Sequence, residues 1–301
     1  MVIFKKILTF LSIIKELACP VTSIEKKTFS FSQNKTSVPS DIPRIIWLYW
    51  GSGRDDTLVD LCIKNIKTKC NKYQVNFLDE NNYSSFIKKI DFPPNILAAH
   101  KSDLIRLNLL KKYGGIWVDA TSFLFDDFDW VINSCSADDV FVCYSDDCTT
   151  DFNQPIVENW LIASPPGSHF IIEWLKEFEK SIFNDQGDSY YDDLIGSNIV
   201  QGLPELSYLR CYVACALVLS KRKYNLQMVN SGSTGHFLNY IFKSKSIFIA
   251  IAVCLSSSKS IYHPPVLKFT SGTRFWVRIF LEKKIYLKHS ILGEVISGVD
   301  E

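Results

Sequence analysis

The strongest constraint on the fold is an alternation of strand and helix patterns between residues 45 and 118. An aromatic-rich run, Ile45–Trp50, predicts a strand that ends at a Gly-Ser-Gly turn. Apolar residues at helical spacing follow, then the alternating run "YQVNFLDE", then the helix pattern of "PPNILAAHKSDLIRLNLLKKYGG" and a third apolar run, "IWV". Strand, helix, strand, helix, strand is typical of a parallel, doubly wound α/β sheet.

Asp119 ends the third of these strands. Ligands on such sheets bind outside the carboxyl ends of the strands, so Gly51 and Asp119 should meet at one crevice. A charge at the end of a buried strand is costly unless something pairs with it. Two interpretations stay open: a turn-forming aspartate that caps the next segment, or a carboxylate that reaches a Mg²⁺ or Mn²⁺ ion bridging a diphosphate.

Asp103 and Arg106 stand three residues apart on a predicted helix. Their neighbours, which wrap most of its circumference, are apolar: Leu104, Ile105, Leu107, Leu109 and Leu110. Such a helix is buried, and buried charges are rarely left unpaired. The pair is either structural, or a site where Asp103 accepts sugar hydroxyls and Arg106 binds phosphate.

Three further residues have open roles. Trp50 is either the wall of a nucleobase pocket beside Gly51 or a core tryptophan. The run "YHPPVLKFTSGTR" is a polar island after apolar sequence. Its His263 is either a packed histidine or a ligand for manganese, and its Lys268 is a candidate for binding phosphate.

Composition limits the class of protein. The chain has 301 residues, 47% hydrophobic and 22% charged, which is globular and long enough for one large or two small domains. A net charge of +1 gives no general argument for nucleic acid, and we expect no nucleic-acid partner. The 9 cysteines without a CxxC pair indicate a reducing compartment, and Cys211 with Cys215 are too few for a zinc site.

No segment predicts a transmembrane helix. The opening run "MVIFKKILTFLSIIKELACP" is interrupted by Lys15 and Glu16, short of the ~20 apolar residues that a span needs, although it could lie flat on a membrane. "IFIAIAVCL" (247–255) predicts a buried strand, and residues 22–40 a linker. The basic and aromatic C-terminal run either packs back on the domain or docks on an anionic membrane. We expect a cytoplasmic protein, with peripheral contact at the inner face of the membrane left open.

The order of four motifs resembles the capsular polysaccharide synthesis protein family: "IPRIIWLYWG", "SDLIRLNLLKKYGGIWVDAT", "ENWLIASPPGSHF" and "PPVLKFTSGTR". That family is related to glycosyltransferase family 32, which includes yeast-type initiating mannosyltransferases and the sugar-transferring domains of large clostridial toxins. The resemblance runs from about Ile42 to Arg274, and the "SDLIR…YGGIWVDAT" block is its most specific part.

The resemblance implies the A-type glycosyltransferase fold, a Rossmann-like α/β domain with a mostly parallel sheet flanked by helices. It places this domain over residues 41–275, after an amphipathic segment and linker (1–40) and before a basic amphipathic helix (276–301). The resemblance implies Trp50, Asp103, Arg106, Asn159 and Trp160 at the nucleotide-sugar, and we expect Gly51 and Lys268 to bind it as well. Of these, Asp103 and Arg106, together with Asp119, are the implied catalytic residues.

The resemblance implies Asp119 as a ligand for Mn²⁺ or Mg²⁺, and we expect Thr121 and, by its residue type, His263 beside it. Family 32 usually has a second aspartate where this chain has Thr121, and the capsular family tends to share the Asp-Ala-Thr variant. A neutral hydroxyl is a weaker ligand, so metal affinity should fall and reliance on Arg106 and Lys268 should rise.

The predicted function is transfer of a sugar from a UDP- or GDP-linked donor to a hydroxyl of a glycan or lipid-linked acceptor, in capsular or cell-surface polysaccharide synthesis. The resemblance implies retention of anomeric configuration by a front-face reaction, because no residue stands out as a covalent nucleophile. The alternative, motivated by Thr121, is a catalytically silent nucleotide-sugar-binding or assembly subunit. A phosphatase with Asp119 as nucleophile would need a second aspartate two positions later, which the sequence lacks.

Overall fold

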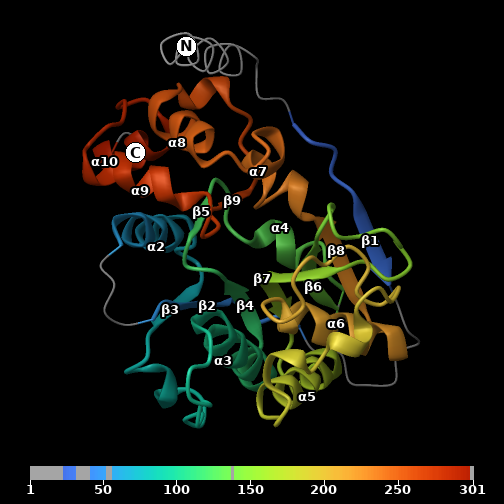
Figure 1. The fold of residues 1–301 in the computed structure, drawn as a ribbon. Coiled ribbons are helices and arrows are strands. Elements are labelled where there is room, and N and C mark those ends of the chain that lie inside the picture. The colour runs from blue at the N-terminus through green and yellow to red at the C-terminus, as the bar shows by residue number, and fades with distance from the viewer. Residues whose placement is uncertain (1–22, 32–40, 52–55, 137–138, 299–301) are drawn as a thin grey trace.

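The computed structural model describes residues 23–31, 41–51, 56–136 and 139–298 (Figure 1). The strands are β1 (Thr28–Phe31), β2 (Ile45–Tyr49), β3 (Gln74–Leu78), β4 (Gly115–Val118), β5 (Ser122–Leu124), β6 (Val140–Tyr144), β7 (Val157–Ser164), β8 (Leu226–Asn230) and β9 (Val266–Lys268). The helices are α2 (Thr57–Lys69), α3 (Ala98–Tyr113), α4 (Asp129–Ile132), α5 (His169–Ile182), α6 (Arg210–Lys221), α7 (Phe237–Ile241), α8 (Ser246–Leu255), α9 (Arg274–Glu282) and α10 (Ile291–Ser297). The strand and helix order predicted between residues 45 and 118 is confirmed.

One mixed sheet organises the molecule. Its strand order is β1-β8-β6-β7-β4-β2-β3, and β5 with β9 form a separate two-stranded sheet. Strands β3, β2, β4, β6 and β8 run in one direction, and β7 and β1 in the other. Helices flank the sheet on both faces (Figure 1). This is the predicted α/β fold, Rossmann-like, with a mostly parallel sheet flanked by helices.

The register brings three chain segments to one edge of the sheet. Parallel β2 and β4 pair Trp47 with Trp117, so the residues that follow both strands emerge together. Antiparallel β7 pairs Leu161 with Val118, so β7 begins at the edge where β4 ends. The end of β2, the end of β4 and the start of β7 therefore lie together at the carboxyl ends of the parallel strands, where ligands bind in α/β sheets. This end of the sheet is called the edge below.

Two core layers cover the two faces of the sheet. Trp47 and Tyr49 belong to the cluster that packs against α3, α5 and α6, whereas Ile46 and Leu48 belong to the cluster that includes residues of α2 and α4. Successive side chains of a strand point to opposite faces, so a strand covered on both sides is apolar throughout. This explains why β2 and β4 are continuous hydrophobic runs.

Two glycines join α3 to β4. Gly114 and Gly115 have φ angles of 61° and 91°, which L side chains rarely adopt. A Cβ atom on Gly115 would lie 2.5 Å from the carbonyl oxygen of Ile45, and the indole Nε1 of Trp47 donates to the Gly114 carbonyl at 2.9 Å. The helix is therefore held tightly against β2 at the point where β4 begins.

The prediction of a buried strand over residues 247–255 is wrong, because this run forms most of helix α8. An apolar run of this length has no period that separates a strand from a buried helix. Here Phe248, Ile249 and Val253 are buried in a third cluster shared with α9, α10 and the β5–β9 sheet. Where the sequence predicts one C-terminal helix there are two, α9 and α10, and both pack on α8.

Strand β1 lies inside the predicted linker, so that prediction is wrong for residues 28–31. These residues pair antiparallel with β8. Asn230 holds the residues before β1, because its Oδ1 accepts from the Lys27 amide at 2.9 Å and its Nδ2 donates to the Glu25 carbonyl at 3.1 Å. The predicted amphipathic segment at the start of the chain, and Ser52 with Gly53, lie outside the described residues. Over the described ranges, no helix is long and apolar enough to cross a membrane.

Candidate functional site

Asp119 lies directly after β4 and is paired with two cations. Its Oδ1 accepts hydrogen bonds from Arg106 Nη2 and from the Trp117 indole, both at 3.0 Å. Its Oδ2 accepts from Lys268 Nζ. Burial alone would raise the pKa of Asp119, but Lys268 and Arg106 more than offset this and hold it below its ordinary value. The carboxylate is therefore charged and held from two sides.

Arg106 is 3% exposed and connects the helix to the sheet. Its Nη1 donates to the Asn159 carbonyl at the start of β7, and its Nη2 also lies 3.3 Å from Asp103 Oδ1. The guanidinium lies over the Trp117 ring, 4.7 Å from its centroid. Burial lowers the pKa of Arg106, but Asp103 and Asp119 together raise it above its ordinary value. These contacts make the Asp103–Arg106 pair internal, as both interpretations of the sequence expect.

Asp103 is 5% exposed and accepts a hydrogen bond from Asn159 Nδ2 at 3.0 Å. Burial raises the pKa of Asp103 to about 6, although Arg106 pulls it down. One strand residue thus holds both helix charges, since the carbonyl of Asn159 accepts from Arg106 and its side chain donates to Asp103. The side chains of Asp103, Arg106, Asp119 and Lys268 form one connected set, called the charged network below.

Lys268 reaches the charged network from β9. Antiparallel pairing places it opposite Ser122, three residues after Asp119. Its backbone amide donates to the Gly235 carbonyl at 2.7 Å, and the next amide, of Phe269, donates to the Thr121 carbonyl at 2.9 Å. The lysine backbone is therefore fixed from both sides, and its side chain is only 13% exposed.

Trp50 and Gly51 follow β2 at the same edge. Trp50 is half-buried, its amide donates to the Leu78 carbonyl at 3.0 Å, and the Arg274 guanidinium lies 5.0 Å from its ring centroid. A Cβ atom on Gly51 would meet only Glu80 Oε1, at 3.9 Å. An indole beside an open backbone position suits a flat ligand group, with Arg274 as a neighbour that sequence reasoning did not select.

Sequence reasoning also missed a buried set around Glu158, next to the charged network. Glu158 Oε2 accepts from the Trp160 indole at 2.7 Å and from Ser231 Oγ, and lies 3.4 Å from His236 Nδ1. The Trp160 carbonyl accepts from the Asp119 amide at 2.9 Å, so this set contacts the backbone of the site. A signal was present in the sequence: Glu158 is a charged residue close to the apolar run of residues 160–163, and a charge there is costly unless it is paired.

The predicted metal ligands do not form a donor set that fits a resident divalent cation. His263 Nε2 contacts Ser258, its ring stacks on Phe125 at 4.1 Å, and the β5–β9 register carries it away from Asp119. Thr121 offers a neutral hydroxyl, and Asp119 already pairs with two cations. Within the described ranges, no three His, Cys, Asp or Glu side chains gather as a metal site. Magnesium and manganese prefer several oxygen ligands, commonly including carboxylates.

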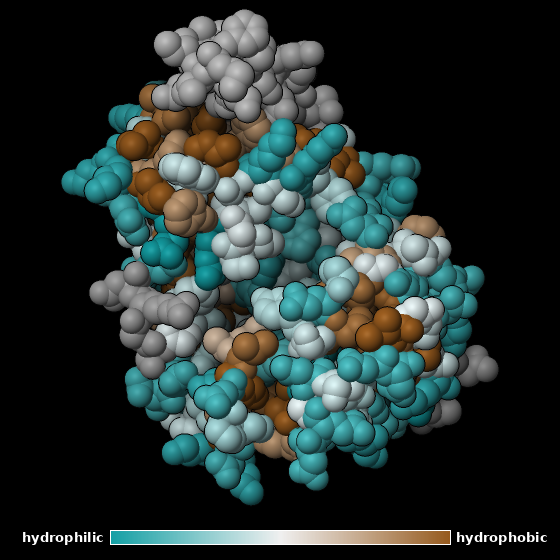
Figure 2. Space-filling model, viewed as in Figure 1, coloured by the Kyte–Doolittle hydropathy of each residue, from teal (hydrophilic) through white to brown (hydrophobic). Residues whose placement is uncertain are grey.

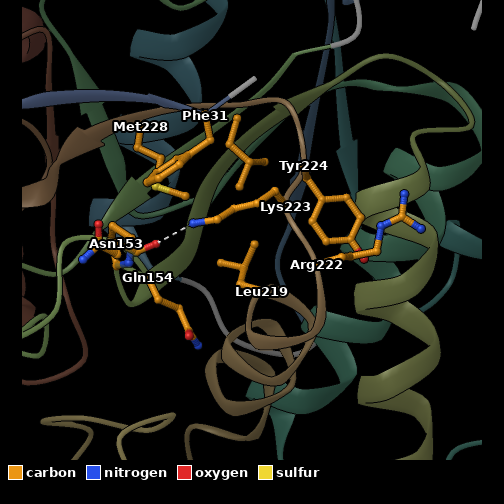
Figure 3. Close-up of a pocket in the computed structure, with 10 residues that line it drawn as sticks. Phe31, Asn153, Gln154, Leu219, Arg222, Lys223, Tyr224 and Met228 are labelled. Carbon is orange, nitrogen blue, oxygen red and sulfur yellow. Dashed lines mark hydrogen bonds between the residues drawn. The ribbon is translucent and has the colours of Figure 1, made fainter. Parts of the chain in front are cut away.

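A separate pocket lies beside β1, β8 and the end of α6. Its lining includes Phe31, Tyr224 and Met228, and Lys223 Nζ donates there to the Asn153 carbonyl at 3.3 Å (Figure 3). None of the residues predicted for the nucleotide-sugar lines this pocket. This pocket is therefore separate from the charged network.

Comparison with known proteins identifies the family. The model of the family described as "Capsular polysaccharide synthesis protein" matches residues 14–191, more than half of the chain. This chain belongs to the capsular polysaccharide synthesis protein family. The residues of this chain that the family model matches include Trp50, Asp103, Arg106, Asp119 and Asn159. Lys268 and His263 lie after the matched residues.

The family member is also similar to individual proteins. "O-glycosyltransferase braB" of Annulohypoxylon truncatum is 29% identical over 189 residues, covering 54% of this chain and 43% of that protein, so the match spans less than half of that relative. The solved structure "PaToxG Glycosyltransferase" is 14% identical, covers 87% of this chain and 88% of its own, and has a TM-score of 0.36. The galactosyltransferase LgtC in complex with donor and acceptor sugar analogs is 9% identical, with 79% and 94% covered and a TM-score of 0.39. Both TM-scores lie below 0.5, so neither likeness identifies a function.

Proposed function

We propose that this protein is a glycosyltransferase that moves a sugar from a UDP- or GDP-linked donor to a hydroxyl of a glycan or lipid-linked acceptor. Membership of the capsular polysaccharide synthesis protein family supports a place in capsular or cell-surface polysaccharide synthesis. The name of its curated relative, an O-glycosyltransferase, points the same way.

The charged network is the observation that carries this proposal. Two carboxylates and two cations from α3, β4 and β9 meet at one edge of the sheet, although Asp119 and Lys268 are 149 residues apart in the chain. Taking charges out of water is costly, so a purely structural role would be served as well by apolar residues of similar volume. A cluster of this kind suits a ligand that carries both phosphate and hydroxyl groups.

Each residue has a role in that chemistry. Trp50 stacks on the base, Asp103 accepts hydrogen bonds from donor sugar hydroxyls, and Asn159 holds Asp103 in place. Breaking the anomeric bond leaves negative charge on the departing diphosphate. Arg106 and Lys268 stabilise that charge through N–H donors that are already oriented. The acceptor hydroxyl attacks from the same face, which retains the anomeric configuration.

A requirement for Mn²⁺ or Mg²⁺ stays a prediction from the family resemblance. When bound, such an ion would supply Lewis-acid stabilisation of the diphosphate. Because the donor set around Asp119 does not fit the ion, the roles above are assigned to side chains of the chain alone.

The proposal is tested with purified protein and a panel of UDP- and GDP-sugars. We expect one donor class to raise the melting temperature and to be hydrolysed or transferred. Asp119→Asn should lower the rate about a hundredfold, because Arg106 and Lys268 lose the charge that positions them. Asp126→Asn, at an exposed position, is the matched control. A panel without any bound donor, or an Asp119→Asn variant of normal rate and normal melting temperature, contradicts the proposal.

The second candidate function is a catalytically silent nucleotide-sugar-binding or assembly subunit. The specific observation in its favour is Thr121 at the position of a second aspartate, next to a carboxylate that two cations already neutralise. Calorimetry separates the two functions: donor binding without hydrolysis or transfer to any acceptor, with or without manganese, favours the silent subunit.

We also propose peripheral contact with the inner face of the membrane, from a cytoplasmic location, to reach a lipid-linked acceptor. On α9, Phe275 is 56% and Trp276 38% exposed, and Leu287 beyond it is 54% exposed. Exposed lysines follow at positions 283, 284 and 288. Figure 2 shows apolar side chains at the surface around α8. Exposed aromatic and basic side chains together suit an anionic lipid surface.

A further inference from the structure

Lys268 occupies the position at Asp119 that a metal ion would need. Of the two carboxylate oxygens, Oδ1 accepts from Arg106 and Trp117, and Oδ2 accepts from Lys268. A divalent cation at this carboxylate would have to displace the lysine or lie in contact with a like charge. The backbone of this segment is fixed, because the Lys268 amide donates to Gly235 and the Phe269 amide to Thr121, so Nζ could leave Asp119 only by rotation of the lysine side chain.

Arg106 is fixed just as firmly on the opposite side. The Asn159 carbonyl, the two aspartates and the Trp117 ring surround its guanidinium. Its Nε is buried without a hydrogen-bond partner among the described residues. Lys268 has three N–H donors, and one of them suffices for Asp119 Oδ2. Both cations therefore keep donor capacity beyond the bonds that hold Asp119.

We propose that Lys268, together with Arg106, takes the place of the divalent cation in this protein, so that the donor diphosphate is bound and stabilised as a leaving group without metal. This inference rests on the proposed function. The bond from the anomeric carbon to the β-phosphate oxygen breaks with its electron pair going to that oxygen. The acceptor oxygen bonds to the anomeric carbon, and its proton passes to the departing phosphate oxygen. Lys268 and Arg106 donate hydrogen bonds and keep their protons.

If Lys268 takes the place of the metal ion, this accounts for the threonine at position 121 in the Asp-Ala-Thr motif. A second carboxylate at position 121 would serve a metal ion, but beside a single ammonium group it would leave excess negative charge facing a diphosphate. Thr121 keeps the side chain neutral, with 4% of the residue exposed. The charges of the network then balance: two carboxylates and two cations.

The test measures binding of UDP and GDP to the full chain by calorimetry, in EDTA and in manganese. Wild-type protein should bind its nucleotide with a Kd that differs less than about twofold between the two buffers. Lys268→Ala should weaken binding in EDTA about tenfold or more, as expected for loss of a charge-assisted hydrogen bond. Because Asp119 Oδ2 is then freed, manganese should restore part of the affinity, and bound Mn²⁺ should be detectable by electron paramagnetic resonance. Lys268→Arg keeps the charge and should stay metal-independent.

Outcomes separate this inference from the proposed function. Wild-type protein that binds UDP or GDP only with manganese overturns the inference and leaves the proposed function standing. Wild-type protein that binds neither nucleotide in either buffer overturns the proposed function. If Lys268→Ala does not fold, the comparison of wild type and Lys268→Arg in the two buffers still decides the question.

Discussion

Glu158 pairs with His236 beside the candidate site, with Oε2 of the buried glutamate 3.4 Å from Nδ1 of the partly exposed histidine. The same oxygen also accepts from Trp160 and Ser231. Burial would raise the pKa of Glu158, but these donors, His236 first, hold it below its ordinary value. A buried carboxylate with three donors fixes the start of β7, on which the position of Arg106 depends.

Glu158→Gln should therefore reduce stability near neutral pH. We expect a loss of ~2 kcal/mol in the free energy of unfolding, the range for hydrogen bonds to a charged group. The pKa is depressed in the folded state, so this stabilisation is present above the ordinary value of 4.5 and is lost as the pH falls through the folded pKa. Urea unfolding of wild type and variant should give curves that converge on acidification. Glu205→Gln, at an exposed position, should change little, and a pH-independent difference for Glu158→Gln would contradict this account.

Gly235→Ala should disturb the site through its neighbour. A Cβ atom there would lie 2.5 Å from the Trp160 ring, which is 1% exposed and cannot move away. Overpacking of this kind costs ~1–3 kcal/mol, and the shifted Gly235 carbonyl would displace Lys268. Gly272→Ala has open space around it and is the control, with an expected change below ~0.5 kcal/mol. Equal melting temperatures for the two variants would show that Trp160 does not confine Gly235.

Donor binding should weaken as the pH falls through about 6. Burial raises the pKa of Asp103 to about 6, and protonation turns one carboxyl oxygen from an acceptor for sugar hydroxyls into a donor. The effect of pH on stability has the opposite sign to its effect on donor binding. Because the pKa of Asp103 is raised on folding, Asp103 contributes most to the free energy of unfolding at low pH, and this contribution falls as the pH rises to about 6. Calorimetry with the preferred nucleotide-sugar between pH 5 and pH 7.5 measures the effect. Asp103→Asn should bind more weakly at neutral pH and lose this pH dependence; an unchanged profile would remove Asp103 from the donor site.

Replacing Phe275 and Trp276 by serine should reduce membrane contact. Flotation of the full chain with vesicles of phosphatidylserine and phosphatidylcholine should recover less of the double variant than of wild type, because the exposed aromatic side chains no longer enter the interface. Tyr208→Ser removes a 46% exposed aromatic residue elsewhere and serves as the control. Equal recovery of all three proteins would contradict membrane contact through Phe275 and Trp276, and α9 and α10 would then only pack on the domain.

Local patterns predicted the central strands and helices well. Apolar residues at a spacing of about 3.6 predicted α2, and Gly114 with Gly115 predicted the end of α3. The burial argument for Asp103 and Arg106 also holds, since a helix that is apolar on most sides leaves its charges only each other and the sheet to contact. These features depend on residues close together in sequence.

Long-range partners could not be predicted in the same way. Strand β1 is rich in Ser and Thr, and its pairing with β8 involves residues about 200 positions away. Ser231 lies 73 residues from Glu158, and no local sequence pattern in either segment predicts the hydrogen bond between them. His263 was a reasonable ligand by residue type, but only the register of β5 with β9 reveals that it points elsewhere.

Gly114 and Gly115, which join α3 to β4, determine how closely Arg106 on the helix lies to Asp119 after the strand. One extra residue at that joint would lengthen the connection and change how the end of α3 is held against Ile45 and Trp47 of β2. The hydrogen bond from Arg106 on α3 to Asp119, directly after β4, depends on that placement. A side chain at Gly114 or Gly115 would bring its Cβ atom to 2.5 Å from a backbone atom, so the alignment of helix arginine and strand aspartate requires glycine at both positions.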